Sequence, residues 1–255
     1  MTEDDLTLAL RLADAAGSAI RPFFRKRFVR EIKQDASPVT EADRAAEAAM
    51  RSILEAERPT DGIVGEEYGR SRDGAERIWV LDPIDGTRAF IAGRPLFGTL
   101  VALMEGGKPV LGLIDQPIIG DRWIGALGRP TLFNGARAAT RACVELADAH
   151  LGTTSPAAFP PGDLPRFERA CAAAGDILWG GDCHNYGLVA SGHLDAVVES
   201  GLQLYDFAAL IPVVEGAGGR MTDWQGRSLN AESPGQVIAA GDPALIEPIA
   251  AMLNQ

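Results

Sequence analysis

An apolar run that ends in closely spaced aspartates is the feature that most constrains this chain. Residues 78–82 read Ile-Trp-Val-Leu-Asp, which is typical of a buried β-strand, and Pro83-Ile84-Asp85 follows directly. Two carboxylates so close together at a strand end repel each other and destabilise the fold unless a cation lies between them. The sequence therefore predicts a fold that brings a cation to the end of this strand.

The residues around the two aspartates suggest which ion that is. Pro83 has no amide donor and bends the chain, so the carbonyl of Ile84 can turn toward the same cation. Carboxylate and carbonyl oxygens favour Mg²⁺ or Mn²⁺ over zinc. Gly86 and Thr87 then open a helical turn, whose free backbone amides suit a phosphate group. The alternative is a plain acidic turn, because Asp-Gly is a common turn dipeptide.

Two other acidic positions are candidates for the same site. Glu66 and Glu67 follow Val64-Gly65, and side-chain alternation lets only one of these glutamates face a given site. Asp206 stands at the start of an apolar helix. Taken alone, the glutamates are typical of a solvated acidic loop, and Asp206 is typical of a helix N-cap.

Hydrophobic periodicity and turn residues indicate alternating helices and strands, so the fold class is α/β or α+β. Helices are predicted over 3–26, from about Thr40 to before Pro59, over 163–174 and 206–217, and from Asp242-Pro243 to the C-terminus. Strands are predicted over 78–82, 99–104, 110–114, 194–199, 219–223 and 236–240, the second and third forming a hairpin. The Pro- and Gly-rich stretch 157–164 is the predicted boundary between two halves.

Composition and charge exclude several classes of protein. The net charge of −11 opposes binding to the phosphates of nucleic acid and is compatible with divalent cations. The cysteines Cys143, Cys171 and Cys183 are odd in number and far apart, which indicates buried thiols in a reducing cytoplasm rather than disulfides. The N-terminus lacks the features of a signal peptide, and no stretch approaches the ~18 apolar residues of a membrane span. We expect a cytoplasmic protein with no nucleic-acid or membrane partner.

Taken together, these motifs resemble those of the inositol monophosphatase superfamily of metal-dependent, lithium-sensitive phosphatases. The resemblance covers essentially the whole chain and is carried by Gly65-Glu66-Glu67, by Trp79–Thr87, and by Asp206 followed by Glu215–Gly219. It implies a layered αβαβα sandwich and suggests a homodimer. Residues 1–150 would form an α+β half with most metal ligands, and 151–255 an α/β half with the substrate loop and the last ligand, together one compact unit.

The resemblance also implies the site residues. The expected Mg²⁺ ligands are Glu66, Asp82, the Ile84 carbonyl, Asp85 and Asp206, and the expected phosphate cradle is Gly86 with Thr87. The segment 37–43 resembles a motif whose aspartate, here Asp43, supports the threonine that orients the attacking water, here Thr87; from the residues alone Asp43 is equally a helix cap. Gly180-Gly181-Asp182 and Glu199 match positions that contact the alcohol portion of the substrate.

The resemblance implies direct attack of a metal-activated water on the phosphate ester, with no phosphoenzyme. It implies roughly two or three Mg²⁺ ions in the site, for which Mn²⁺ can substitute. Glu66, Asp85 and the Ile84 carbonyl would hold the ion that activates water. Asp82, Asp85 and Asp206 would hold the ion that stabilises the leaving alkoxide. Because this alkoxide is part of the substrate, Asp85 and Asp206 are also expected substrate-binding residues.

Residues 85–103 and 179–188, with Tyr205-Asp206-Phe207, are similar to the histidinol-phosphatase branch of the superfamily. This predicts hydrolysis of L-histidinol phosphate in histidine biosynthesis, because Asp182 and Glu199 can pair with the ammonium of that substrate. Asp182 can equally cap its loop. The alternatives are an inositol monophosphatase-like or broad-specificity sugar or nucleotide phosphatase, and a non-catalytic Mg²⁺-binding protein.

The roles of four neighbouring residues stay open. Tyr186 and Trp179 can flank an imidazole ring or serve as core aromatics. His184 is better explained by packing than as a base, because the mechanism needs none. Arg94 receives no role from the sequence.

Overall fold

The computed structural model of the chain describes residues 2–26, 31–32, 38–39 and 41–255. Within those ranges no helix combines the length and the apolar character needed to cross a membrane. The predicted cap at Thr40 lies outside the described residues, and the second helix is described from Glu41 onward.

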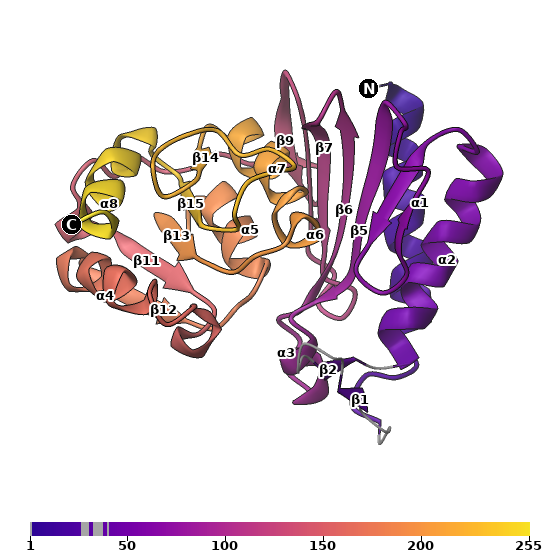
Figure 1. Ribbon diagram of the computed structural model, residues 1–255, viewed down its shortest axis with the longest axis horizontal. Coiled ribbons are helices and arrows are strands. Elements are labelled where there is room, and N and C mark those ends of the chain that lie inside the picture. The colour runs from indigo at the N-terminus through magenta and orange to yellow at the C-terminus, as the bar shows by residue number, and fades with distance from the viewer. Residues whose placement is uncertain (1, 27–30, 33–37, 40) are drawn as a thin grey trace.

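The elements form five layers in the order helix, sheet, helix, sheet, helix (Figure 1). Helices α1 (Glu3–Ile20) and α2 (Glu41–Glu57) cover the outer face of an eight-stranded sheet in the order β10-β9-β8-β7-β6-β5-β3-β4. Its strands are β3 (Gly62–Gly65), β4 (Gly69–Ser71), β5 (Arg77–Asp85), β6 (Gly98–Glu105), β7 (Lys108–Asp115), β8 (Arg122–Ala126), β9 (Arg129–Phe133) and β10 (Ala136–Arg137). The predicted αβαβα class is confirmed.

The middle layer and the second half complete the sandwich. Helices α5 (His184–Ala190), α6 (Leu204–Phe207) and α7 (Leu210–Gly216) lie between the sheets. The second sheet has the order β12-β11-β13-β15-β14 and is covered by α4 (Leu164–Ala173) and α8 (Ile246–Leu253). Its strands are β11 (His150–Thr153), β12 (Asp176–Trp179), β13 (Ala196–Glu199), β14 (Arg220–Thr222) and β15 (Val237–Ala240). The short elements are β1 (Glu31–Ile32), β2 (Pro38–Val39), α3 (Thr87–Ile91) and the 3₁₀ turns Leu146–Asp148, Pro156–Ala158 and Pro243–Leu245.

Prolines explain two differences from the predicted helices. The first helix ends at Ile20 instead of residue 26, because Pro22 lacks the amide that would continue the hydrogen-bond ladder. The helix predicted over 206–217 begins at Leu204 and breaks into α6 and α7. The break falls at Ala208, the residue four before Pro212, where the proline ring would collide with the carbonyl.

The strands also differ from the predictions. The predicted hairpin is confirmed as β6 and β7, and its residues Leu100 and Leu111 are fully buried in the core. The change from the first sheet to the second falls between Arg137 and His150, close to the expected division between residues 1–150 and 151–255, whereas the Pro- and Gly-rich stretch 157–164 lies between β11 and the start of α4. Sequence analysis gave no signal for β3, β8, β9, β11 or β12.

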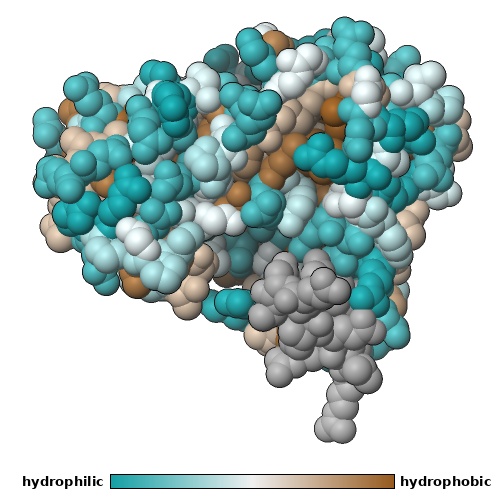
Figure 2. All heavy atoms as spheres, viewed as in Figure 1, coloured by the Kyte–Doolittle hydropathy of each residue, from teal (hydrophilic) through white to brown (hydrophobic). Residues whose placement is uncertain are grey.

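The middle layer packs directly on the first sheet because two strand positions have no side chain. A Cβ added to Gly112 of β7 would lie 1.9 Å from the carbonyl oxygen of Ala209, and one added to Gly125 of β8 would lie 2.2 Å from that of Pro212. The backbone at the start of α7 therefore contacts the sheet, and this contact holds the adjacent α6 beside β5. On the face drawn in Figure 2, hydrophilic residues cover most of both halves, and hydrophobic residues show mainly along their junction.

We expect Gly112→Ala to lower the free energy of unfolding by about 2 kcal/mol, because over-packing in a filled core forces backbone movement. Gly74→Ala is the matched control, since a Cβ there meets nothing within 4 Å. Urea denaturation of both variants measures the difference. Equal stability of the two variants would contradict direct backbone packing of α7 on β7.

Candidate active site

The end of β5 is bent at the point the sequence predicts. The pairing of β5 with β6 is regular up to Asp82 opposite Leu100 and resumes, with a shifted register, at Asp85 opposite Gly98. The bulge is fixed from both sides, since the Ile84 amide donates to Asp82 Oδ1 at 3.0 Å and the Thr99 hydroxyl donates to the Pro83 carbonyl at 2.8 Å. Such a bulge re-aims side chains at a strand end.

Three carboxylates meet at this bulge. Asp82 and Asp85 come from β5 and Asp206 from α6, and one oxygen of each lies within 4.8 Å of the others. Asp82 is only 1% exposed. Glu66, in the turn after β3, is close enough to Asp82 that its charge raises the pKa of Asp82. The structure thus brings together the four carboxylates that the sequence analysis expected to hold metal.

Burial and mutual repulsion perturb these groups strongly. Burial, then the charges of Glu66, Asp85 and Asp206, raises the pKa of Asp82 well above its usual value. Burial and the Asp206 charge raise the pKa of Asp85 to about 7. Such a set of hard oxygen donors is stable in its ionised form only beside a cation, and it fits Mg²⁺ or Mn²⁺.

The phosphate cradle and its neighbours follow directly in the chain. Gly86 adopts φ 90° and caps α3, which begins at Thr87. The Thr87 hydroxyl donates to the carbonyl of Ile84, the expected carbonyl ligand, at 3.2 Å. Asp43 is fully buried in the first turn of α2. The support of Thr87 by Asp43 stays a prediction.

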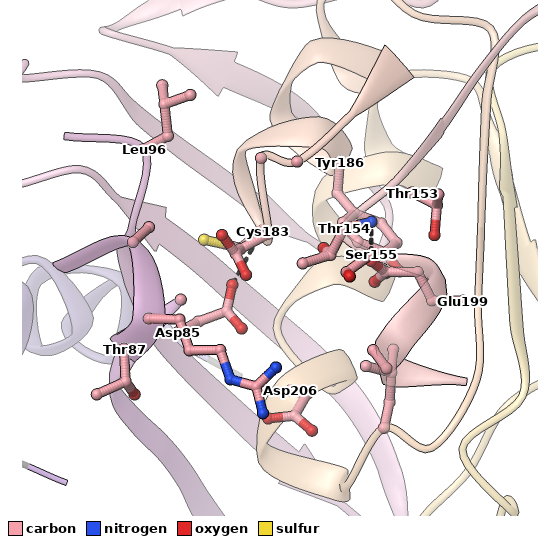
Figure 3. Close-up of a pocket in the computed structure, with 18 of the residues that line it drawn as sticks. Asp85, Thr87, Leu96, Thr153, Thr154, Ser155, Cys183, Tyr186, Glu199 and Asp206 are labelled. Atoms are coloured by element: carbon pink, nitrogen blue, oxygen red, sulfur yellow. Dashed lines mark hydrogen bonds between the residues drawn. The ribbon is translucent and has the colours of Figure 1, made fainter. Parts of the chain in front are cut away.

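A cavity of about 520 Å³ opens from the carboxylates toward the second sheet. Asp85 and Thr87 enter it from the β5 side, and Thr154, Ser155 and Glu199 face them from the other half (Figure 3). Its size is that of a small-molecule site. Both halves of the chain are therefore needed to enclose a ligand.

Glu199 is held rigidly on the far wall of this cavity. It is 7% exposed at the end of β13 and accepts hydrogen bonds from the Thr154 amide at 2.9 Å and the Tyr186 hydroxyl at 2.8 Å. Burial raises the pKa of Glu199, and these two donors oppose the rise. Tyr186 is fully buried beside it, so its hydroxyl positions a carboxylate as well as filling the core.

The loop Gly180-Gly181-Asp182 crosses to the metal side. All three residues have positive φ (85°, 123° and 47°), a conformation that glycine adopts without strain and that Asp182 adopts against its preference. The carboxylate of Asp182 lies 2.9 Å from where a Cβ on Gly86 would stand. Burial, then the charges of Asp85 and Glu199, raises the pKa of Asp182 to about 8. The adjacent Cys183 amide donates to Asp85 Oδ2 at 2.5 Å, which links this loop to the carboxylate cluster.

The residues without assigned roles fall into two groups. Arg88 and Arg94 line the cavity, and their charges lower the pKa of Asp182. His184 and Trp179 do not line it: His184 lies 5.9 Å from the ring of Trp123, and Trp179 is half-exposed against Phe167. The packing interpretation of His184 fits its place, and Trp179 does not flank a ligand in this cavity.

Sequence reasoning missed Thr154 and the hydrogen bond from Tyr186 to Glu199. Thr154 follows β11, a strand that gave no alternating pattern. Tyr186 and Glu199 stand on different elements, so no local pattern relates them.

The fold and this site belong to one family. The model of the inositol monophosphatase family matches residues 1–255, so the chain is a member of that family and a phosphoric monoester hydrolase. It is 50% identical over 240 residues to the bifunctional phosphatase IMPL2 of Arabidopsis thaliana (91% of this chain, 69% of that one). It is 38% identical over 233 residues to the histidinol-phosphatase of Mycobacterium tuberculosis (89% and 90%). The solved structure of an inositol monophosphatase from Zymomonas mobilis superposes with a TM-score of 0.92 at 57% identity (99% and 98%).

Membership in this family carries a general property of the site. The family is metal-dependent, generally on Mg²⁺, which agrees with the chemistry of the carboxylate cluster at the end of β5. The number of ions stays a prediction.

We expect Tyr186→Phe to raise the pKa of Glu199 further, because the lost hydroxyl donates to the ionised carboxylate and so favours the charged form. A carboxyl NMR titration measures this. The Michaelis constant for the substrate should rise about tenfold, the effect of one hydrogen bond to a charged group. Tyr68→Phe, on a half-exposed ring outside the cavity, is the control. An unchanged Glu199 pKa would contradict this role of Tyr186.

Proposed function

We propose that this phosphatase hydrolyses L-histidinol phosphate to L-histidinol and phosphate with Mg²⁺. The observation that carries the proposal is that two further carboxyl groups line the cavity: the partly buried Asp182, next to Gly86, and the buried Glu199 on the wall formed by the second half. Their raised pKa values mean that each gains from a cationic partner, because a nearby positive charge restores the ionised form. The ammonium group of histidinol phosphate supplies such a charge, whereas an inositol ring offers only hydroxyls.

The names of the relatives support this choice without fixing it. Histidinol-phosphatases from Mycobacterium tuberculosis and Chlorobaculum parvum are each 38% identical to this chain over most of its length. The first-named plant relative is called bifunctional, and the Zymomonas structure is titled an inositol monophosphatase. An inositol phosphate or a broader range of esters is therefore the alternative substrate class.

In the proposed reaction Asp82, Asp85, Asp206, Glu66 and the Ile84 carbonyl hold the divalent cations. When bound, these cations neutralise the phosphate, stabilise the leaving alkoxide and lower the pKa of a bound water.

The chain's own groups bind and orient the ester. The backbone amides at Gly86 and Thr87 donate to phosphate oxygens, and Thr87, supported by Asp43, orients the attacking water. Glu199 and Asp182 accept hydrogen bonds from the ammonium, which places the alcohol portion over the loop at Gly181. The water oxygen bonds to phosphorus as the bond between phosphorus and the alkoxide oxygen breaks. The attacking water gives up one proton to solvent, and the alkoxide takes up one proton from solvent and leaves as the alcohol. In this form the site needs no covalent intermediate.

The test is phosphate release with Mg²⁺ from L-histidinol phosphate, inositol 1-phosphate, fructose 1,6-bisphosphate and 3′-phosphoadenosine 5′-phosphate. We expect kcat/KM for histidinol phosphate to exceed the others by at least ~100-fold, which corresponds to ~2.7 kcal/mol of transition-state discrimination. A flat profile, or preference for inositol phosphate, would remove this substrate and keep the phosphatase class. No hydrolysis of any ester would favour a Mg²⁺-binding protein without activity.

Two variants separate chemistry from recognition in the same assay. Asp85→Asn should abolish turnover of every ester while the far-ultraviolet spectrum stays that of the native fold. Asp182→Asn should lower kcat/KM at least tenfold for histidinol phosphate but not for its analogue without the amino group, because only the former carries the ammonium. Equal losses on both esters would contradict ammonium recognition by Asp182.

The homodimer and the cytoplasmic location stay predictions, for which gel filtration and cell fractionation are the measurements.

A further inference from the structure

Glu47 is a fully buried carboxylate that no step of the reaction uses. It stands on α2 with 0% exposure, and a buried charge is tolerated only when it is paired and hydrogen-bonded. Its oxygens accept hydrogen bonds from the Glu67 amide at 2.7 Å, the Tyr68 amide at 3.2 Å and Arg51 Nε at 2.7 Å. Glu47 is therefore bound to the turn between β3 and β4, the turn that carries Glu66.

Arg51 closes the same turn from outside. Its Nη2 donates to the carbonyl of Gly69, the first residue of β4, while its Nε pairs with Glu47. The Arg51 side chain is only 11% exposed, so this ion pair is shielded from solvent. Glu47 and Arg51, one helical turn apart, together bind the amides and the carbonyl that the turn presents to α2.

At the end of β3, the Glu47 carboxylate occupies the space that a side chain at position 65 would fill. A Cβ added to Gly65 would lie 1.9 Å from Glu47 Oε1, so residue 65 has no side chain where Glu47 approaches. On the other side, the Glu66 amide donates to the carbonyl of Leu81, the residue before Asp82, at 3.2 Å. The backbone of Glu66 is thus fixed between β5 and Glu47.

We propose that Glu47, paired with Arg51, is a positioning residue that holds Glu66 at the carboxylate cluster and thereby sets the affinity of the site for its divalent cation. Glu47 touches neither substrate nor reacting atoms and acts through the Glu66–Tyr68 backbone. The inference rests on the proposed metal role of Glu66 and not on the choice of phosphate ester. Loss of the groups that orient a metal ligand typically weakens metal affinity 10–100-fold.

The test is the dissociation constant of Mn²⁺, measured calorimetrically on the full chain without substrate. Glu47→Gln keeps the shape of the side chain but loses the charge that pairs with Arg51, and its amide group cannot accept every donor that Glu47 accepts. We expect Mn²⁺ to bind about 10–100-fold more weakly to this variant. The Mg²⁺ concentration for half-maximal activity should rise in parallel.

Asp195→Asn is the matched control. Asp195 is 1% exposed, pairs with Arg141 at 2.6 Å and accepts a hydrogen bond from the His150 amide at 2.8 Å. It directly precedes β13, at the opposite end of the strand from Glu199, and does not line the cavity. Both variants remove the charge of a buried carboxylate that is paired with an arginine, so both should unfold at lower denaturant concentration. Only Glu47→Gln should change the Mn²⁺ dissociation constant, and Asp195→Asn should stay within about twofold of the native value. If Glu47→Gln loses stability with native Mn²⁺ affinity, Glu47 is purely structural and the proposal is overturned.

Two further variants keep the proposal testable if Glu47→Gln does not fold. Arg51→Met removes the partner of Glu47, and Gly65→Ala displaces Glu47 from the strand side. Both should weaken Mn²⁺ binding in the same direction, and native affinity in both would overturn the proposal. Failure to hydrolyse histidinol phosphate alongside the expected change in Mn²⁺ affinity would count against the proposed substrate and leave this role of Glu47 intact.

Discussion

Electrostatic repulsion among Asp82, Asp85 and Asp206 is the constraint around which the rest of the structure is arranged. Their oxygens lie within 4.8 Å of one another, and burial raises the pKa of both strand aspartates. Folding gains nothing from such a cluster by itself, because like charges in a poorly solvated place destabilise each other. The arrangement is favourable when a divalent cation is bound, and metal binding then contributes to folding stability. The bulge in β5 and the direct packing of α7 on the sheet both bring these groups to one point.

Both ends of the cavity contain carboxylates whose pKa burial raises, and different groups favour their ionised forms at the two ends. The metal end relies on cations, which belong to the family as a whole. At the far end two fixed donors, Tyr186 and Thr154, stabilise the charge of Glu199. In the loop that crosses to the metal side, the charges of Arg94 and Arg88 lower the pKa of Asp182 against the effect of burial. An incoming substrate that carries a positive charge would lower the cost of ionising both groups. On the proposed function, we expect the second half of the chain to govern selectivity among phosphate esters and the first half to carry most of the chemistry.

Local features of the sequence predicted the site better than long-range contacts did. Asp82, Pro83 and Asp85 stand within one segment, so the bend and the pairing of these two carboxylates followed from their spacing. The addition of Glu66 and Asp206 to the site, and the layered fold, followed from the family resemblance. The hydrogen bonds between Glu47 and the turn that carries Glu66 join residues about twenty positions apart. The break between α6 and α7 arises because the ring of Pro212 would collide with a carbonyl one turn earlier. Strands β11 and β12 show too little alternation to be predicted, although the second sheet begins with them. Packing, not propensity, decides such features.

Anomalous diffraction from crystals of the protein grown with Mn²⁺ tests the central claim most directly, because it locates the ion without reference to any substrate. The account predicts anomalous peaks bounded by Asp82, Asp85 and Asp206, with a further peak beside Glu66 and the Ile84 carbonyl if more than one ion binds. Crystals that hold Mn²⁺ elsewhere, or none at millimolar concentration, with the carboxylates at the end of β5 hydrogen-bonded to one another, would contradict it.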